Sequence, residues 1–296
     1  MLTGKEPTLD SNLIKYIKTA KQSNYLKIEI QTNAIRVADI NYATALKTAG
    51  LTDAFVSIHH HDSLISDKIT QSKNTFINTI QGVKNLILNN VNITANIVIN
   101  ELNYRELKQI CKFIVSLGIT NIVFSYVSPV CKAKENKEKI IPKIENTLPF
   151  FYESMDYLIN QNINFRIASR CGIPLCKLDK FKIYSDEYNE YQRWNDNSDK
   201  IKLDSCKNCQ HYHSCNGIWK NYIKLYGSQE FQTNKEKHIE INLGKNCNQN
   251  CLFCMIPSES KYRNFISKEQ VEEKIIHYSN KNYNSIGFIG GEPTYT

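Results

Sequence analysis

The chain has 296 residues, of which 41% are hydrophobic and 22% charged, and 37 lysines and arginines against 29 acidic residues give a net charge of +8. This composition fits one or two folded domains and excludes wholesale disorder. The basic residues are dispersed rather than gathered in a stripe, so we expect no specific nucleic-acid interface. No apolar run approaches the ~20 residues that a membrane span needs, and the first residues lack the pattern of a signal peptide.

Cysteine is abundant, with ten residues in the chain. Without an export signal, such a count indicates metal, cluster or redox chemistry in a reducing compartment rather than disulfide bonds. We therefore expect a cytoplasmic protein.

The first half of the chain alternates strand-like and helix-like segments. A helix is expected over residues 9–22 and a strand over 25–31, where Leu26, Ile28 and Ile30 share one side. Further strands are predicted at 54–59, 92–100, 121–127 and 163–168, and further helices at 40–48, 73–88, 103–117 and 144–160. Strict alternation predicts an α/β fold whose parallel strands form a barrel or a doubly wound sheet.

The pattern changes after residue 170. Residues 171–227 carry five of the ten cysteines among aromatic and polar residues, and the polar stretch 228–237 is typical of a linker. Residues 238–296 resume the alternation, with a strand at 238–243, a cysteine-rich loop, a helix at 267–278 and a strand at 285–289. Together with residues 1–170, these segments predict a four-part organisation.

The loop after the strand at 238–243 reads Cys247-Asn-Gln-Asn-Cys251-Leu-Phe-Cys254. Three thiolates at these separations can bind three corners of an iron–sulfur cubane and leave the fourth iron open, whereas an ordinary closed centre has four cysteines. A structural zinc site would supply four closed ligands, often from paired CxxC motifs. The spacing therefore favours a cluster, with zinc and a chance arrangement as the alternatives.

The strand at 285–289 ends in a glycine motif, Gly290-Gly291-Glu292-Pro293-Thr294. Glycines let the backbone approach a ligand, and α/β proteins bind ligands at the carboxyl ends of parallel strands; the alternative is a plain turn. The N-terminus repeats the motif as Gly4-Lys5-Glu6-Pro7-Thr8. The chain looks cut or permuted at the same structural point twice.

These motifs together resemble the radical S-adenosylmethionine (radical SAM) superfamily, whose signature is CxxxCxφC with an aromatic φ, here Phe253, followed by a GGEP strand end. The resemblance implies that SAM chelates the open iron of a [4Fe–4S] cluster held by Cys247, Cys251 and Cys254. It implies that Phe253 packs near the adenine of SAM, and that the methionine end meets Gly290, Gly291, Glu292 and Pro293. An electron from the cluster would cleave SAM to a 5′-deoxyadenosyl radical, which abstracts hydrogen from a substrate.

In the same resemblance, most of residues 1–227 match the family's partial parallel (β/α) barrel downstream of the GGEP strand, with an appended cysteine-rich region. Polar residues that close three successive strands are then candidate SAM contacts: Asn33, Ser57 and Asn100. Polar residues commonly close a strand, which is the alternative explanation. The run from His59 to Asp62 could supply metal ligands, but with no further ligand in register we expect a loop with one functional member.

A second cysteine group resembles the auxiliary-cluster region of SPASM-type radical SAM enzymes, although a further cysteine that those enzymes have after Cys215 is missing. We expect a four-cysteine site from Cys176, Cys206, Cys209 and Cys215, with Cys171 as a substitute. It would hold a second iron–sulfur cluster or zinc; a zinc knuckle using His211 or His213 and uncoordinated core cysteines are the alternatives. By analogy, such clusters serve electron transfer or substrate anchoring, often on peptides.

The order of the segments is unusual, because the first strand, cluster loop and GGEP strand of a radical SAM core stand last. Residues 1–235 alone would leave the strand edge at 25–31 unpaired, and the C-terminal unit is too small to bury its faces. We hypothesise that this unit docks beside 25–31, within one chain or between chains, and that its GGEPT takes the SAM position. The alternative is a piece of a tandem radical SAM protein, with parts of two sites and no turnover.

The sequence thus predicts an enzyme that cleaves SAM reductively and abstracts hydrogen from an unidentified substrate, with peptides as one candidate class. The expected cofactors are a [4Fe–4S] cluster, SAM and a second iron–sulfur cluster or zinc. The expected partners are a reductant protein or small-molecule electron donor and the substrate, with no membrane and no specific nucleic acid. The competing class is a metal-binding module or scaffold without catalysis.

Overall fold

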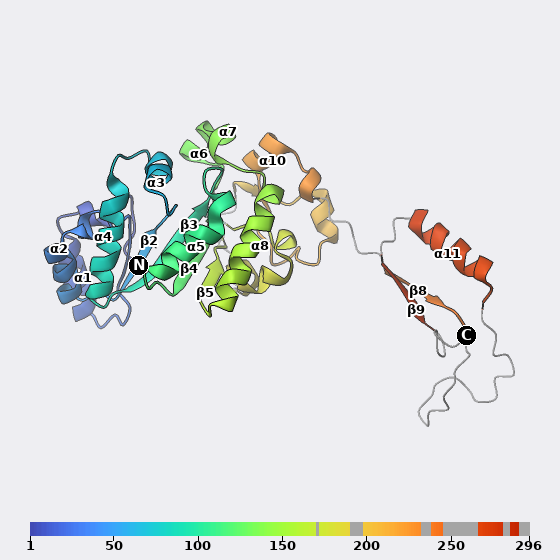
Figure 1. Cartoon of the computed structure of the whole chain (residues 1–296), viewed down its shortest axis with the longest axis horizontal. Coiled ribbons are helices and arrows are strands. Elements are labelled where there is room, and N and C mark those ends of the chain that lie inside the picture. The colour runs from blue at the N-terminus through green and yellow to red at the C-terminus, as the bar shows by residue number, and fades with distance from the viewer. Residues whose placement is uncertain (170–171, 190–197, 232–237, 245–265, 281–284, 290–296) are drawn as a thin grey trace, which may run out of the picture. The chain divides into compact units, whose positions relative to one another are not determined.

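The computed structural model describes residues 1–169, 172–189, 198–231, 238–244, 266–280 and 285–289 (Figure 1). The chain divides into two compact units, Met1–Gln232 and Thr233–Thr296. Several predicted ligands lie outside the described residues: Cys171, Cys247, Cys251, Phe253, Cys254, Gly290, Gly291, Glu292 and Pro293. Their roles, and the four-part division of the chain, stay predictions.

The first unit is built on a sheet of five parallel strands in the order β1-β2-β3-β4-β5. They are β1 (Glu29–Thr32), β2 (Asp53–Ser57), β3 (Asn92–Ile99), β4 (Asn121–Tyr126) and β5 (Asn164–Ile167). Each strand pairs with the next one in the chain, as a barrel requires, whereas a doubly wound sheet reverses its strand order. The predicted α/β class is confirmed, and the sheet is a partial parallel (β/α) barrel.

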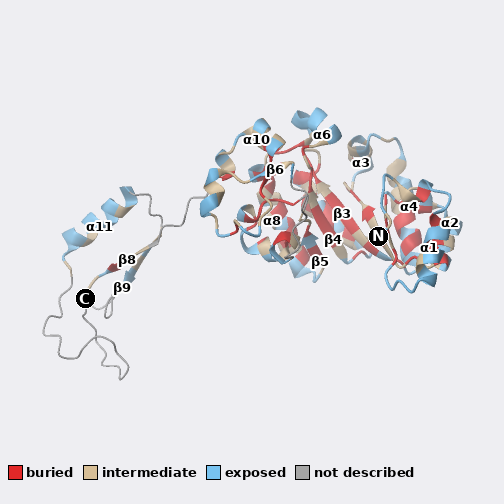
Figure 2. Cartoon of the chain, turned by 180° about the vertical axis from the view of Figure 1, so that it is seen from behind, coloured by how far each residue is buried: buried red, intermediate tan, exposed pale blue. Residues whose placement is uncertain are grey.

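Helices connect the strands and cover one face of this sheet (Figure 1). The long ones are α1 (Leu13–Gln22), α2 (Ile40–Ala49), α4 (Thr75–Leu88), α5 (Leu107–Ser116) and α8 (Ile144–Asn160). Alternate strand residues point to the helices and are buried, among them Ile30, Val56 and Ile97 at 0% exposure. This face is the hydrophobic core, and it carries most of the buried residues of the first unit in Figure 2.

The opposite face of the sheet carries mainly polar residues, with the apolar side chains of Phe55, Val98 and Val123 among them. Ser57 of β2 and Asn96 of β3 are register partners on it, and Ser125 of β4 donates a hydrogen bond to Asn96 Oδ1 (2.9 Å). Side chains alternate along a strand, so the strand residues that do not face the helices point to the opposite side. There they line the concave face of the partial barrel.

Two local predictions were wrong. The expected strand at 25–31 begins at Glu29, because α1 ends in a turn at Asn24 (φ +61°), which leaves Leu26 96% exposed. The sequence analysis also missed α3 (Ser63–Thr70), a short and largely polar helix. Its signal was Asp62, whose carboxylate accepts the backbone N–H groups of Leu64 and Ile65 (2.8 and 3.0 Å) and so caps the first turn.

The cysteine-rich part of the first unit is held by a small antiparallel pair, β6 (Lys200–Ile201) and β7 (Ile218–Trp219). The ring of Trp219 stacks on Tyr126 of β4, with ring centroids 5.5 Å apart, which anchors this part to the sheet. Short helices complete the unit: α6 (Cys131–Glu135), α7 (Lys137–Ile140), α9 (Asp186–Asn189) and α10 (Lys220–Tyr226).

Tyr222 and Glu230 fasten the end of this region to α8. The Tyr222 hydroxyl accepts the backbone N–H of Ile144 (2.7 Å) and donates to Glu230, which also accepts the backbone N–H of Glu145 (3.0 Å). The first N–H groups of a helix have no partner within the helix, so this pair of side chains caps α8.

The described part of the second unit contains the parallel pair β8 (His238–Asn242) and β9 (Ser285–Ile289), joined in register from His238↔Ser285 to Asn242↔Ile289, and the helix α11 (Lys268–Asn280). These elements match the strand–helix–strand order expected from the sequence. Across the described residues of both units, no helix is long and apolar enough to cross a membrane.

Candidate functional site

The N-terminal GKEPT motif is fixed at the outer edge of β1. Leu2 pairs in parallel with Ile30: its N–H donates to the Glu29 carbonyl (2.6 Å) and its carbonyl accepts the Gln31 N–H (3.0 Å). The chain therefore enters the motif directly after a single parallel bridge to β1.

Glu6 is the hub of this motif. Its Oε1 accepts the N–H and the hydroxyl of Thr8 (3.1 and 2.6 Å) and the hydroxyl of Thr32 (2.7 Å), and its Oε2 accepts the N–H of Asn33 (2.7 Å). Thr8 is 0% exposed and Thr32 3%, so the hydroxyl groups of both depend on this carboxylate. Glu6 thus ties the motif to the carboxyl end of β1.

This arrangement bears on the docking hypothesis. Within the first unit, the place beside Ile30 is held by Leu2 of the N-terminal copy, so a strand from elsewhere could pair there after displacing Leu2 and Glu6. Residues 290–296, which hold the second copy, lie outside the described residues. The docking hypothesis stays a prediction, and the tandem alternative fits the observed edge without any displacement.

A cavity of about 180 Å³ opens at the carboxyl ends of β1 and β2. Hydroxyl and amide side chains from the strand ends, α3 and α4 dominate its lining: Asn33, Ser57, Ser66, Thr70, Ser72, Thr75 and Thr79. Ile35, Ile58, His59 and Phe76 complete it. Among the described residues, the lining has no carboxylate or ammonium group, so this part of the cavity suits a neutral ligand that offers several hydroxyl or heterocyclic groups.

Two of the three strand-end residues predicted to contact SAM, Asn33 and Ser57, line this cavity together. Asn33 is also held locally, because its Oδ1 accepts the Ile35 N–H (3.0 Å). The third, Asn100, does not line the cavity: its Nδ2 donates to the Val98 carbonyl (2.8 Å) and its Oδ1 accepts the Leu102 N–H (2.9 Å). A role for Asn100 in shaping the turn after β3 explains both contacts.

Asn103 is a residue that the sequence analysis missed. Its Nδ2 donates to the carbonyls of His59 (3.0 Å) and Val98 (2.9 Å), and its Oδ1 accepts the N–H of Asn100 (2.8 Å). Because one amide holds the ends of both β2 and β3, Asn103 fixes the backbone of His59 at the cavity. Asparagine in a loop is common, so the sequence offered no signal that would have singled it out.

His59 brings an imidazole to the cavity. Its Nδ1 is buried and has no hydrogen-bond partner among the described residues. Desolvation lowers the pKa of His59 from 6.5 to about 4, so the ring is neutral near pH 7. A neutral ring offers one donor and one acceptor, which again suits a hydroxyl or a heterocycle.

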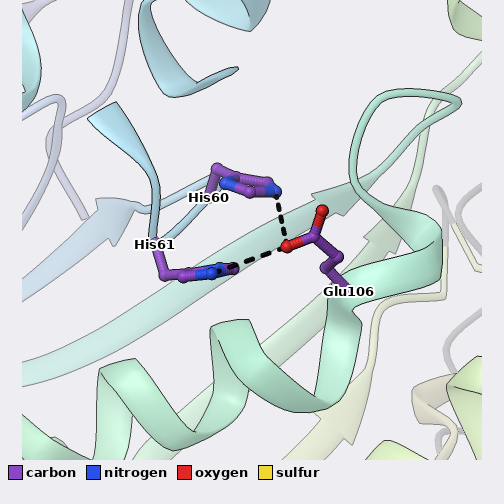
Figure 3. Close-up of side chains that lie close together, drawn as sticks. All are labelled: His60, His61 and Glu106. Carbon is purple, nitrogen blue, oxygen red and sulfur yellow. Dashed lines mark ion pairs between the residues drawn. The ribbon is translucent and has the colours of Figure 1, made fainter. Parts of the chain in front are cut away.

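His60 and His61 lie against Glu106, the residue before α5, as Figure 3 shows. Glu106 Oε2 is 3.8 Å from His60 Nε2 and 3.5 Å from His61 Nε2, and the two rings stack with centroids 4.6 Å apart. The sequence analysis found no further ligand for the histidine run, and the structure supplies Glu106. Metal bonds of about 2.1 Å would hold ligand atoms about 3.4 Å apart, close to these spacings.

The protonation of His60 argues against a metal ion there. The backbone N–H of Asp62 donates to His60 Nδ1 (2.9 Å), so the neutral ring carries its proton on Nε2. A metal ion would need a lone pair at that nitrogen. We therefore assign no metal to this group: His60 Nε2 carries a proton and has no hydrogen-bond partner among the described residues, since Glu106 Oε2 is 3.8 Å away.

The second cysteine group is brought together in the structure. Desolvation raises the pKa of Cys176 to about 12 even though the residue is exposed, and the charges of Cys215, Cys209 and Cys206 add to the rise. Zn–S bonds of about 2.3 Å would place sulfurs about 3.8 Å apart. No three cysteine sulfurs of the described residues lie within 4.8 Å of one another. The choice between an iron–sulfur cluster and zinc for this group stays a prediction.

Comparison with known proteins links both units to one family. A model described as the radical SAM superfamily matches residues 1–114 and 241–296, more than half of the chain. A probable GTP 3′,8-cyclase from Saccharolobus islandicus (strain Y.N.15.51 / Yellowstone #2) is 32% identical over 132 residues, which are 44% of this chain and 41% of the cyclase. A 7,8-dihydro-6-hydroxymethylpterin dimethyltransferase from Methanocaldococcus jannaschii is 40% identical over 53 residues, which are 18% of this chain and 10% of that enzyme.

Solved structures give weaker likenesses. Native anSMEcpe with bound AdoMet and the Kp18Cys peptide has a TM-score of 0.47 at 15% identity and covers 74% of each chain. A domain of a pyruvate-formate lyase-activating enzyme from Bacteroides vulgatus ATCC 8482 has a TM-score of 0.43 at 13% identity and covers 56% of this chain and 96% of that one. The chain spans less than half the length of the curated relatives described above.

Proposed function

Because the chain belongs to the radical SAM superfamily, we propose that it cleaves SAM reductively and uses the resulting radical to abstract hydrogen from a substrate. The observation that carries the proposal is the family match over 241–296, which contains both CxxxCxxC and GGEPT. Three thiolates suit a cubane with one open iron. When bound, the [4Fe–4S] cluster supplies the electron that cleaves SAM to methionine and a 5′-deoxyadenosyl radical.

The residues proposed to hold these groups follow from the motifs. Cys247, Cys251 and Cys254 are the proposed cluster ligands, Phe253 the proposed neighbour of the adenine, and Gly290 to Pro293 the proposed contacts of the methionine end. We propose that the ribose of SAM lies in the cavity at β1 and β2. Asn33, Ser57 and His59 offer it neutral hydrogen-bond donors and acceptors there. Such groups orient a ligand and exclude water from its reactive atom.

The second cysteine group is proposed to hold an auxiliary iron–sulfur cluster on Cys176, Cys206, Cys209 and Cys215. The effect of Cys215, Cys209 and Cys206 on the pKa of Cys176 supports a shared site, and the resemblance to SPASM-type enzymes favours an iron–sulfur cluster over zinc. Cys171 remains the alternate ligand.

The proposed partners are an electron donor, either a reductant protein or a small molecule, and a substrate whose class is open between two candidates. The SPASM-like cysteines suggest a peptide. The names of the two relatives, a GTP cyclase and a dihydropterin methyltransferase, suggest a fused heterocycle with an aminopyrimidinone ring. Incubation with GTP, with a dihydropterin or with a peptide library, followed by detection of the product, would separate these classes.

Anaerobic reconstitution with iron, sulfide and SAM, followed by a strong reductant, tests the enzyme proposal. We expect 5′-deoxyadenosine from the wild-type chain and none from Cys251→Ala. Cys131→Ala, which removes an exposed thiol outside both motifs, should match the wild type and is the control. About eight iron atoms per chain would indicate two cubanes, and about four would indicate one.

Two outcomes would contradict the proposal. Absence of 5′-deoxyadenosine despite a reduced cluster would favour the tandem-fragment alternative, in which the chain carries parts of two sites. Zinc without sulfide-bound iron in anaerobically purified protein would favour a metal-binding module without catalysis.

A further inference from the structure

The hydroxyl groups that line the cavity at β1 and β2 differ in whether the protein already uses them. Four of those in the described lining donate to a protein oxygen 3.0 to 3.3 Å away: the hydroxyl groups of Thr70, Ser72, Thr75 and Thr79. The hydroxyl groups of Ser57 and Ser66 make no hydrogen bond to a described residue. Because polar groups away from bulk water normally have a partner, these two are open to a ligand.

Ser66 lies on α3, the helix that the sequence analysis missed. It is 8% exposed and lines the cavity, so a hydrogen bond from its hydroxyl would form away from bulk water and would be stronger than one at the surface. Ser57 reaches the same cavity from the end of β2. Two unused hydroxyl groups, carried by two different elements, thus share a space of about 180 Å³.

The start of α3 is fixed to the end of β2. The carboxylate of Asp62 caps the first turn of α3, and its backbone carbonyl accepts the N–H of Ser66 (3.0 Å). The N–H of Asp62 in turn donates to Nδ1 of His60 (2.9 Å), whose side chain is fully buried. The imidazole of His60 therefore attaches the helix that carries Ser66 to the strand that carries Ser57.

The other end of α3 is fastened to α4. The carboxylate of Asp67 accepts the N–H groups of Thr75 (3.3 Å) and Phe76 (3.2 Å) and the hydroxyl of Thr75 (3.1 Å). The ring of Phe76 stacks on Phe113 of α5, with ring centroids 5.9 Å apart. With both ends held, α3 presents Ser66 in one position before a ligand arrives, which lowers the entropic cost of binding.

Resting on the proposed function, which places the ribose of SAM in this cavity, we propose that Ser57 and Ser66 bind the two neighbouring hydroxyl groups of that ribose, one each, and that His60 is a positioning residue for Ser66. Each ribose hydroxyl can donate and accept a hydrogen bond, and a serine hydroxyl can take the complementary role. A phosphate group would find no cationic partner among the described lining residues, so the cavity selects a neutral diol over an anion.

Isothermal titration calorimetry on the full chain, reconstituted anaerobically, tests this inference. The probes are S-adenosylhomocysteine, which lacks the sulfonium group and is not cleaved, and its 2′-deoxy and 3′-deoxy analogues. We expect Ser66→Ala to weaken the binding of S-adenosylhomocysteine about tenfold. The same variant should bind one of the two analogues as tightly as the wild type does, because that analogue lacks the hydroxyl that Ser66 contacts. Ser57→Ala should show this pattern with the other analogue.

Ser63→Ala is the matched control, because Ser63 lies on the same helix but is exposed and outside the cavity lining. It should bind all three ligands as the wild type does. The fluorescence of tryptophan confirms that each variant is folded.

Two substitutions test the positioning role of His60. The amide of His60→Gln stands at the place of Nε2 and leaves the N–H of Asp62 without its acceptor, so binding of S-adenosylhomocysteine should weaken several-fold. Adding Ser66→Ala to it should cost less than Ser66→Ala costs alone, because the two changes remove the same contact. The amide oxygen of His60→Asn stands at the place of Nδ1 and should restore most of the affinity. The serine variants test the diol contacts even if a His60 variant does not fold.

Equal losses for all three ligands in Ser66→Ala, or no loss for any of them, would overturn the inference, and the proposed function would stand as long as 5′-deoxyadenosine still forms. An affinity of His60→Asn no better than that of His60→Gln would overturn the role of His60. A wild-type chain that binds neither SAM nor S-adenosylhomocysteine would instead contradict the proposed function, and the diol contacts with it.

Discussion

The carboxylate of Glu6 offers a sharp test of how the GKEPT motif is held. Glu6→Gln keeps the shape of the side chain but replaces one oxygen with an NH₂ group. If the amide oxygen takes the place of Oε1, the NH₂ faces the N–H of Asn33, which Oε2 accepts at 2.7 Å, and two donors then oppose each other. The reverse orientation disrupts the contacts with Thr8 and Thr32.

The magnitude follows from these contacts. Hydrogen bonds to a charged group contribute about 1.5 to 3 kcal/mol each, and the substitution removes at least one and weakens the other three. We expect the free energy of unfolding of the first unit to fall by about 2 to 4 kcal/mol. Thr8 and Thr32 are buried, so water cannot readily replace the lost acceptor.

The two tryptophans of the chain, Trp194 and Trp219, both belong to the first unit, so fluorescence during urea unfolding reports on that unit selectively. Glu135→Gln, at an exposed position of α6, is the control and should change the free energy by less than about 0.5 kcal/mol. A Glu6→Gln chain as stable as the control would refute the hub role of this carboxylate.

Three further outcomes follow from the structure. The unfolded chain takes up a proton on His59 near pH 6.5 that the folded chain does not accept until about pH 4; the free energy of unfolding should therefore fall by about 3 kcal/mol over this interval in urea titrations, and His59→Gln should flatten the pH dependence. Gly82→Ala should cost about 3 kcal/mol or more, because a Cβ on α4 would overlap the carbonyl oxygen of Ala34; a thermal melt like that of the wild type would show that α4 can shift away from the cavity rim. Tyr222→Phe should cost about 1 to 3 kcal/mol by leaving the N–H of Ile144 without its acceptor, and an undiminished urea midpoint would mean that Tyr222 does not cap α8.

Much of the fold was predictable from periodicity. The helix at 144–160 and the strand at 285–289 have the bounds that the sequence predicted, because long amphipathic helices and apolar strands carry a strong pattern. The errors fall where a local contact overrides the pattern. Leu26 continues the strand alternation in sequence, yet the turn at Asn24 exposes it, and α3 is specified by the cap from Asp62 more than by apolar spacing.

The site was predictable to the extent that strand ends converge. The resemblance to the radical SAM superfamily makes Asn33 and Ser57 candidate SAM contacts at strand ends, and the cavity has both in its lining. Asn100 also closes a strand, but its amide group makes hydrogen bonds within the turn that follows β3. Glu106 could not be found from the sequence, since its partners His60 and His61 lie more than forty residues earlier and only the fold brings them near.

Asn103 carries a consequence for how the cavity responds to an occupant. The Asn103 amide donates to the carbonyls of both His59 and Val98. A ligand that displaces His59 must therefore break one of these hydrogen bonds or move the loop before α5 as well. With this stiffness, the rim of the cavity is preformed and is not reshaped when a ligand binds.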